Sequence, residues 1–172
     1  MVCVWITQQS ANKLTMDAQS EKVLAQVIRE ARIASLGTLH DEAPQVSMVA
    51  YIYAEDFSAF YIFVSRLAQH TVDMQKDNRV SLMICETDDA RSDPQTLVRV
   101  SIRGKAEILQ TGEPGYTPLK EQYIARFPES EKLFNLSDFS FWRISPRGGR
   151  YVAGFAKAFN ITADTLQKAA LR

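Results

Sequence analysis

The stretch TLVRVSIRGKAEIL, residues 96–109, alternates apolar and polar side chains, which is the pattern of a strand with one buried face. One face carries Val98, Val100 and Ile102, and the other carries Arg99, Ser101 and Arg103. Gly104 predicts a bend, because a glycine inside a strand often marks a kink or a bulge. The sequence therefore predicts a long strand that is bent near its middle.

Six further segments carry strand signals, with β-branched and aromatic residues bounded by turn residues. They are residues 32–39, 45–53, 59–65, 79–86, 138–146 and 149–161, and we expect a turn at the RGG of residues 147–149 between the last two. Helical spacing predicts helices over residues 17–32, about 68–76, from near Pro118 to Pro128, and 162–172 with Thr162 as the N-cap. Many strands and few helices predict a mainly β protein, a single antiparallel barrel over residues 17–172 with flanking helices. Residues 1–16 are expected to be a flexible lead-in, and Met16 is a candidate native start.

Composition narrows the classes of function. Lys+Arg and Asp+Glu both number 20, and this zero net charge argues against broad binding to nucleic acid or to an anionic membrane. The two cysteines, Cys3 and Cys85, have no metal-ligand or disulfide spacing, which fits a reducing cytoplasm. No segment has the length of a signal peptide or a membrane span. With His40 and His70 as the only histidines, no multi-histidine metal site is expected, and neither a dinucleotide fingerprint nor a P-loop is present.

A polar cluster follows the apolar segment AFYI directly. FVSRLAQHT, residues 63–71, holds Ser65, Arg66, Gln69 and His70 at the end of a predicted strand. Ser65 could simply cap the next helix, and Arg66 and His70 could be solvated. The alternative is an anion site, because the start of a helix offers backbone N–H groups beside a hydroxyl and a guanidinium. The polar face of residues 96–109 is equally open, either a wet strand face or a cationic wall over a ligand, with Arg99 on it.

The order of these segments resembles a known family. ASLGTL, PQVSMVAYIY, FYIFVSRLAQHTVDMQKDNRVSLMI and RVSIRGKAEIL, followed by FWRISP, resemble the pyridoxamine 5′-phosphate oxidase-like, FMN-binding split barrels. The tail GGRYVAGFAKAFNITADTL resembles the heme-utilisation (HugZ-like) branch of that superfamily. The resemblance implies an antiparallel FMN-binding split β-barrel that forms a homodimer with FMN at the interface.

The resemblance also implies a cofactor site. FMN-binding residues would be Ser47, Met48 and Val49 along the flavin, Ser65, Arg66, Gln69 and His70 at the phosphate, and Arg99 near the ring. The expected function is a cytoplasmic FMN-dependent oxidoreductase acting on a small molecule. The alternatives are a heme-binding or heme-degrading protein and a non-catalytic flavin-binding module.

The chain also departs from these relatives. Ser47 and Ile52 stand where true pyridoxamine phosphate oxidases carry arginine and lysine, so vitamin B6 oxidation is not expected. Gln69 replaces an arginine that many relatives place at the phosphate. No histidine follows His70, whereas heme-degrading relatives use one near the C-terminus as the iron ligand, so weak heme binding at most is expected.

Overall fold

A computed structural model describes residues 16–91, 93–155 and 157–172 of the chain. Most of the expected lead-in, including Cys3, lies outside the described residues. The strands are β1 (Ile33–His40), β2 (Ala43–Tyr53), β3 (Phe60–Ser65), β4 (Arg79–Cys85), β5 (Arg99–Leu109), β6 (Phe139–Val152) and β7 (Ala158–Ile161). The α-helices are α1 (Ala18–Glu30), α2 (Gln69–Lys76), α3 (Tyr116–Arg126) and α4 (Ala163–Ala170), and the 3₁₀ helices are η1 (Pro94–Thr96) and η2 (Pro128–Asn135).

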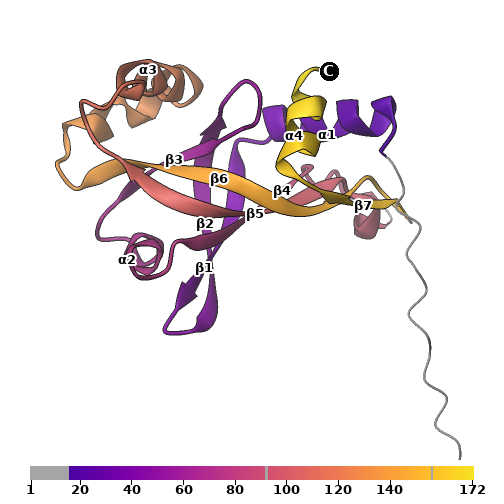
Figure 1. Cartoon of the computed structure of the whole chain (residues 1–172), viewed down its shortest axis with the longest axis horizontal. Helices are drawn as coiled ribbons and strands as arrows, with labels where there is room; N and C mark the ends of the chain where they lie inside the picture. The colour runs from indigo at the N-terminus through magenta and orange to yellow at the C-terminus, as the bar shows by residue number, and fades with distance from the viewer. Residues whose placement is uncertain (1–15, 92, 156) are drawn as a thin grey trace, which may run out of the picture.

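The strands close into an antiparallel barrel. Their order is β3-β2-β1-β4-β5-β6-β7, and β3 also pairs with β6, so six strands form a closed ring and β7 extends it (Figure 1). The predicted mainly β split barrel with flanking helices is therefore confirmed. None of the helices in the described part of the chain is long and apolar enough to cross a bilayer.

The long strand β5 bends where the sequence predicts. Its register with β6 shifts between Arg103 and Gly104, and a Cβ on Gly104 would lie 2.6 Å from the carbonyl oxygen of Ser145. The expected turn at residues 147–149 is wrong, because β6 continues through these residues and pairs with β5 on one side and β7 on the other. A Cβ on Gly149 would lie 2.0 Å from the carbonyl oxygen of Ser101, so this glycine permits a close approach of two strands.

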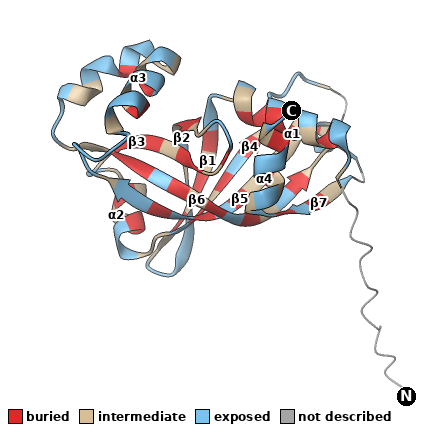
Figure 2. Cartoon of the chain, turned by 45° about the horizontal axis from the view of Figure 1, so that its top comes forward, coloured by how far each residue is buried: buried red, intermediate tan, exposed pale blue. Residues whose placement is uncertain are grey.

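Two apolar clusters hold the elements together (Figure 2). The larger one fills the barrel and continues under α1 and α4, with Leu24, Leu36, Leu82, Ile102 and Tyr151 fully buried. The smaller one lies between the β2–β3–β6 surface and the α3–η2 segment, where Ile52, Phe63, Leu119, Tyr123 and Phe141 are buried. Each fully buried side chain of this size contributes about 1.5–3 kcal/mol. Cys85 is half-buried at the end of β4.

The helix ends follow the local sequence. Asp17 accepts a hydrogen bond from the backbone N–H of Ser20 and caps α1. Thr162 caps α4 as predicted, and its hydroxyl and that of Thr165 form a reciprocal capping box. The third helix, α3, begins at Tyr116, two residues before the expected Pro118, because a proline fits within the first turn of a helix.

Candidate functional site

A gap between β2 and β3 creates a candidate site. The pairing of β2 with β3 ends at Tyr51 and Ile62, although β2 stays paired with β1 as far as Ala43. The last residues of β3 pair only with β6, so the two strands separate. A pocket of about 580 Å³ opens in this split. It is lined by Arg32, Ile33, Met48, Val49, Ala50, Phe63, Val64, Ser65, Ala68, His70, Tyr123, Phe127 and Phe139, and we call it the split pocket.

The walls of the split pocket suit a flat apolar ring. Phe63, Phe139, Tyr123 and Phe127 bring aromatic surface from β3, β6, α3 and the residue that follows α3. Met48 stands on the opposite strand with 66% of its surface exposed, so its thioether is available for contact. Aromatic and thioether side chains adapt well to a planar ligand.

His70 is the histidine among the residues that line the split pocket. Its Nε2 atom is buried and has no hydrogen-bond partner, an uncommon state for a buried polar atom. Burial lowers the pKa of His70 below its usual value, and the carboxylate of Asp73 opposes this effect only in part. The imidazole is therefore held neutral near pH 7, which leaves a lone pair for a metal and weakens its attraction for an anion.

The hydroxyl of Ser65 is already engaged. It donates to Oδ2 of Asp138 and accepts from the backbone N–H of Leu67 at 3.0 Å. Ser65 does not cap the helix, since the N-cap of α2 is Ala68, which has no capping side chain. Arg66 is exposed and does not line the pocket, and its backbone N–H donates to the carbonyl oxygen of Asp138 at 2.7 Å.

Gln69 belongs to a second network, behind the pocket. Its Nε2 lies 2.9 Å from Oδ1 of Asp73 and 2.9 Å from Nδ1 of His40. The fully buried Asp73 also contacts Nδ1 of His40 at 2.8 Å and accepts the hydroxyl of Thr38 at 2.9 Å. Burial opposes ionisation of Asp73, but the hydrogen bonds from Gln69, His40 and Thr38 outweigh it and hold its pKa below the usual range. This Asp73 network fixes α2, and with it His70, against β1.

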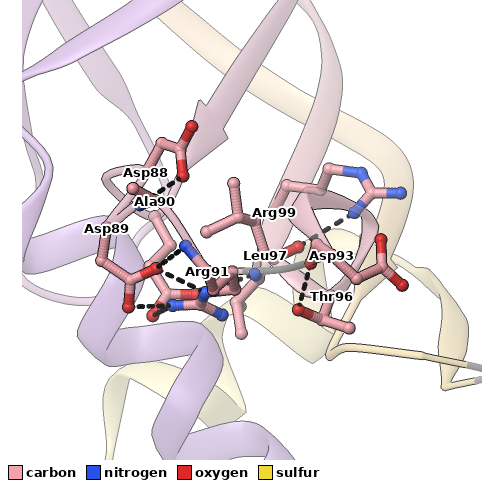
Figure 3. Close-up of polar contacts among 10 residues, drawn as sticks. Asp88, Asp89, Ala90, Arg91, Asp93, Thr96, Leu97 and Arg99 are labelled. Atoms are coloured by element: carbon pink, nitrogen blue, oxygen red, sulfur yellow. Dashed lines mark hydrogen bonds and ion pairs between the residues drawn. The ribbon is translucent and has the colours of Figure 1, made fainter.

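Arg99 lies at the start of β5, away from the split pocket. One nitrogen of its guanidinium, Nη1, donates to the carbonyl oxygens of Gln95 and Leu97 at 3.0 and 2.9 Å (Figure 3). The side chain thereby anchors the η1 segment. Ser47 is half-buried on β2 and does not line the pocket either. Of the expected site residues, the structure brings Met48, Val49, Ser65 and His70 together and leaves Ser47, Arg66, Gln69 and Arg99 outside.

Sequence reasoning missed the other side of the pocket. The guanidinium of Arg32 lies over the ring of Phe127, 5.3 Å from its centroid, at the pocket rim. No carboxylate in the described part of the chain lies within ion-pair distance of Arg32. A free cation beside an apolar pocket favours a ligand with both a flat ring and an anionic group. Arg32 lies just after Ala31, the C-cap of α1.

Comparison with known proteins agrees with the fold. A family model described as pyridoxamine 5′-phosphate oxidase matches residues 20–153. The non-canonical heme oxygenase HOZ, chloroplastic, of Arabidopsis thaliana is 31% identical over 127 residues, which cover 74% of this chain but only 37% of that protein. Heme oxygenase HutZ of Vibrio cholerae is 21% identical over 160 residues, covering 92% of this chain and 90% of that protein.

A solved structure shares the fold of this chain. The heme binding protein from Mycobacterium smegmatis superposes with a TM-score of 0.77 at 24% identity, covering 90% of this chain and 62% of that one. At this identity the likeness shows the fold. With more than half of the residues matched by the family model, the chain belongs to the pyridoxamine 5′-phosphate oxidase family, and its heme-related relatives match the heme-utilisation branch indicated by the sequence.

Proposed function

We propose that this chain binds heme in the split pocket and acts in heme degradation. The observation that carries the proposal is the buried, unpartnered Nε2 of a neutral His70 on an aromatic pocket wall. Heme iron takes a nitrogen donor of this kind as an axial ligand. The names of two curated relatives, both heme oxygenases, support the same substrate.

The other pocket residues fit the rest of the molecule. A porphyrin is flat and apolar across its faces, which suits Met48, Phe63 and Phe139. Its edge carries carboxylates, which suit the unpaired guanidinium of Arg32 at the rim. When bound, heme would supply the iron that activates oxygen, while the chain would bind and orient the ring and exclude water from one face. The sequence expectation of weak binding rested on the missing C-terminal histidine, and His70 offers a different donor.

FMN is the second candidate cofactor, because its flat flavin ring would also fit against the aromatic walls of the pocket. The resemblance to FMN-binding split barrels, together with the family match and Met48 on β2, supports it. Two observations count against a phosphate at the expected position. The Ser65 hydroxyl is held by the Asp138 carboxylate, and Arg66 lies outside the pocket. The FMN-dependent oxidoreductase and the non-catalytic flavin module therefore stay predictions and rank below heme.

The expected assembly and location also stay predictions. We propose a homodimer in which the split pocket lies at the seam, because Met48 and Ile33 at its edge are 66% and 54% exposed and need a cover. A cytoplasmic location and a small-molecule substrate remain part of the same proposal.

Spectral titration tests the function directly. Purified full-length protein would be titrated separately with hemin, FMN and riboflavin, followed by absorbance and by flavin fluorescence. We expect a sharp Soret band that saturates at one heme per chain and decays to a bile-pigment spectrum when ascorbate is added under air. Saturable FMN binding without a Soret shift would contradict the proposal and restore the flavoprotein interpretation.

A further inference from the structure

The link between α1 and β1 is two residues long and carries the cation at the rim of the split pocket. Helix α1 ends at Glu30 and β1 begins at Ile33, so Ala31 and Arg32 belong to neither element. The guanidinium of Arg32 lies over the ring of Phe127 at the pocket rim. Its position therefore depends on how the backbone of the link is held and on where the ring of Phe127 lies.

Arg126, on the last turn of α3, holds the backbone of this link. Its Nη2 donates to the carbonyl oxygens of Ala31 at 2.6 Å and of Arg29 at 2.9 Å. Carbonyl groups at the end of a helix have no partner inside it and lie at the negative end of its dipole, so a guanidinium suits them. A second contact with the link is longer, because the backbone N–H of Tyr51 lies 3.4 Å from the carbonyl oxygen of Arg32. Of these two contacts, the hydrogen bond from Arg126 is the shorter.

Arg126 is also joined directly to the ring beneath Arg32. Phe127 is the next residue and the C-cap of α3, and its backbone N–H donates to the carbonyl oxygen of Tyr123 at 2.8 Å. Both Phe127 and Tyr123 line the split pocket. The guanidinium of Arg126 lies 5.5 Å from the ring centroid of Tyr53 on β2, which fixes it further. Arg126 therefore ties the end of α1 to the end of α3, and these two ends form one part of the pocket rim.

The charges of the two arginines are not offset within the described residues. Arg32 and Arg126 lie 5.3 and 5.9 Å from the ring centroid of Phe127. No carboxylate of residues 16–91, 93–155 or 157–172 lies within ion-pair distance of either guanidinium. Hydrogen bonds to carbonyl oxygens hold Arg126 in place but do not cancel its charge. Two like charges around one ring favour an anion at the rim, because it would interact favourably with both.

We propose that Arg126 is a positioning residue of the split pocket, which holds Arg32 over Phe127 and thereby gives the pocket a preference for a ring that carries a carboxylate. Arg126 does not line the pocket, so it acts through Arg32 rather than by touching the ligand. The inference rests on the proposed function and deepens it, since the carboxylates of heme are the groups that Arg32 would bind. Without Arg126 the aromatic wall would still accept the flat ring, but the pocket would distinguish a free acid from its neutral ester less well.

A double-mutant cycle tests this role. Soret titrations of the full chain would compare hemin with hemin dimethyl ester, which has the same ring and iron but no free carboxylate. Wild type should bind hemin more tightly than the ester. Arg126→Ala and Arg32→Ala should each reduce this preference by about threefold or more, and each should leave the affinity for the ester within about twofold of wild type. The double variant should lose no more than Arg32→Ala alone, because Arg126 acts through Arg32.

Lys120→Ala is the matched control. Lys120 is a second cation of α3 that lies over an aromatic ring, 5.0 Å from the centroid of Phe134, and it makes no hydrogen bond to α1, which the structure describes in full. Its removal should leave the preference for hemin as in wild type. Arg126→Met keeps a long side chain against Tyr53 while removing the donor, so it should show the same loss even if Arg126→Ala fails to fold.

The outcomes separate the positioning role from the proposed function. If the Arg126 variants keep the preference for hemin, or if the losses add in the double variant, the positioning role is overturned while heme remains the ligand. Equal affinity of wild type for hemin and its ester would likewise overturn it, because Arg32 would then bind no carboxylate. A wild type that gives no Soret change with either compound would overturn the proposed function itself, and the positioning role with it.

Discussion

Asp73→Ala should destabilise the protein more than any other single polar substitution near the site. Asp73 is fully buried and accepts from Thr38, His40 and Gln69. Hydrogen bonds to a charged group contribute about 1.5–3 kcal/mol each, but His40 and Gln69 are partly exposed and can turn to water. The buried hydroxyl of Thr38 cannot, so we estimate a total cost of about 3–5 kcal/mol.

Differential scanning calorimetry measures this cost. For a chain of this size 1 kcal/mol shifts Tm by about 2–4 °C, so Asp73→Ala should lower Tm by about 6–20 °C. Gln75→Ala is the matched control, because Gln75 is exposed on the same helix and its side chain makes no hydrogen bond to any residue that the structure describes; its Tm should change by about 1 °C or less. A Tm unchanged in Asp73→Ala would refute the claim that this network fixes α2.

The pH dependence gives the same prediction a second test. The folded pKa of Asp73 lies below its usual value, so the stabilisation is fully present above the unfolded pKa of about 3.9. It is lost as pH falls from there through the folded pKa. The Tm advantage of wild type over Asp73→Asn should therefore shrink only below about pH 4. An advantage that grows on acidification would contradict the assignment.

Three further predictions concern the pocket and the barrel. Arg32→Ala should weaken hemin binding by about three- to tenfold in a Soret titration, since one charge-assisted contact at the rim is lost, and equal affinity would remove Arg32 from the site. Gly149→Ala should abolish soluble expression, because its Cβ would lie 2.0 Å from a backbone carbonyl oxygen of β5, whereas Gly37→Ala, whose nearest neighbour would be 3.6 Å away, should stay folded by circular dichroism. Asp138→Asn should improve FMN binding relative to riboflavin in fluorescence titrations, because it weakens the hold on the Ser65 hydroxyl, and an unchanged ratio would argue against a phosphate beside Ser65.

The barrel could be predicted in large part because β1, β4 and β5 alternate buried and more exposed residues. The alternation over residues 98–103 places Val100 and Ile102 in the core, where both are fully buried. The RGG segment was misjudged because glycines serve turns and close strand contacts equally well. Only the pairing of Gly149 with Ile102 distinguishes the two, and pairing depends on residues almost 50 positions away in the sequence.

The site was predictable only in part. Met48, Val49, Ser65 and His70 come together because the middle of β2 and the end of β3, with the start of α2, line opposite sides of the split. Side-chain direction was not predictable: Arg99 turns to the carbonyl oxygens of its own loop. Arg32 was missed because its partner ring, Phe127, is far away in sequence. The orphaned Nε2 of His70 likewise depends on tertiary packing.

Hemin titration of wild type, His70→Ala and His40→Gln tests the central claim most directly. His40→Gln removes the only other histidine of the chain and keeps a hydrogen-bonding group beside Asp73, so it controls for general loss of imidazole. If His70 ligates the iron in the split pocket, the wild type and His40→Gln should give the same sharp Soret band, and His70→Ala should shift it and weaken binding by at least about tenfold. A Soret band unchanged in His70→Ala and lost in His40→Gln would place the iron elsewhere and contradict the account.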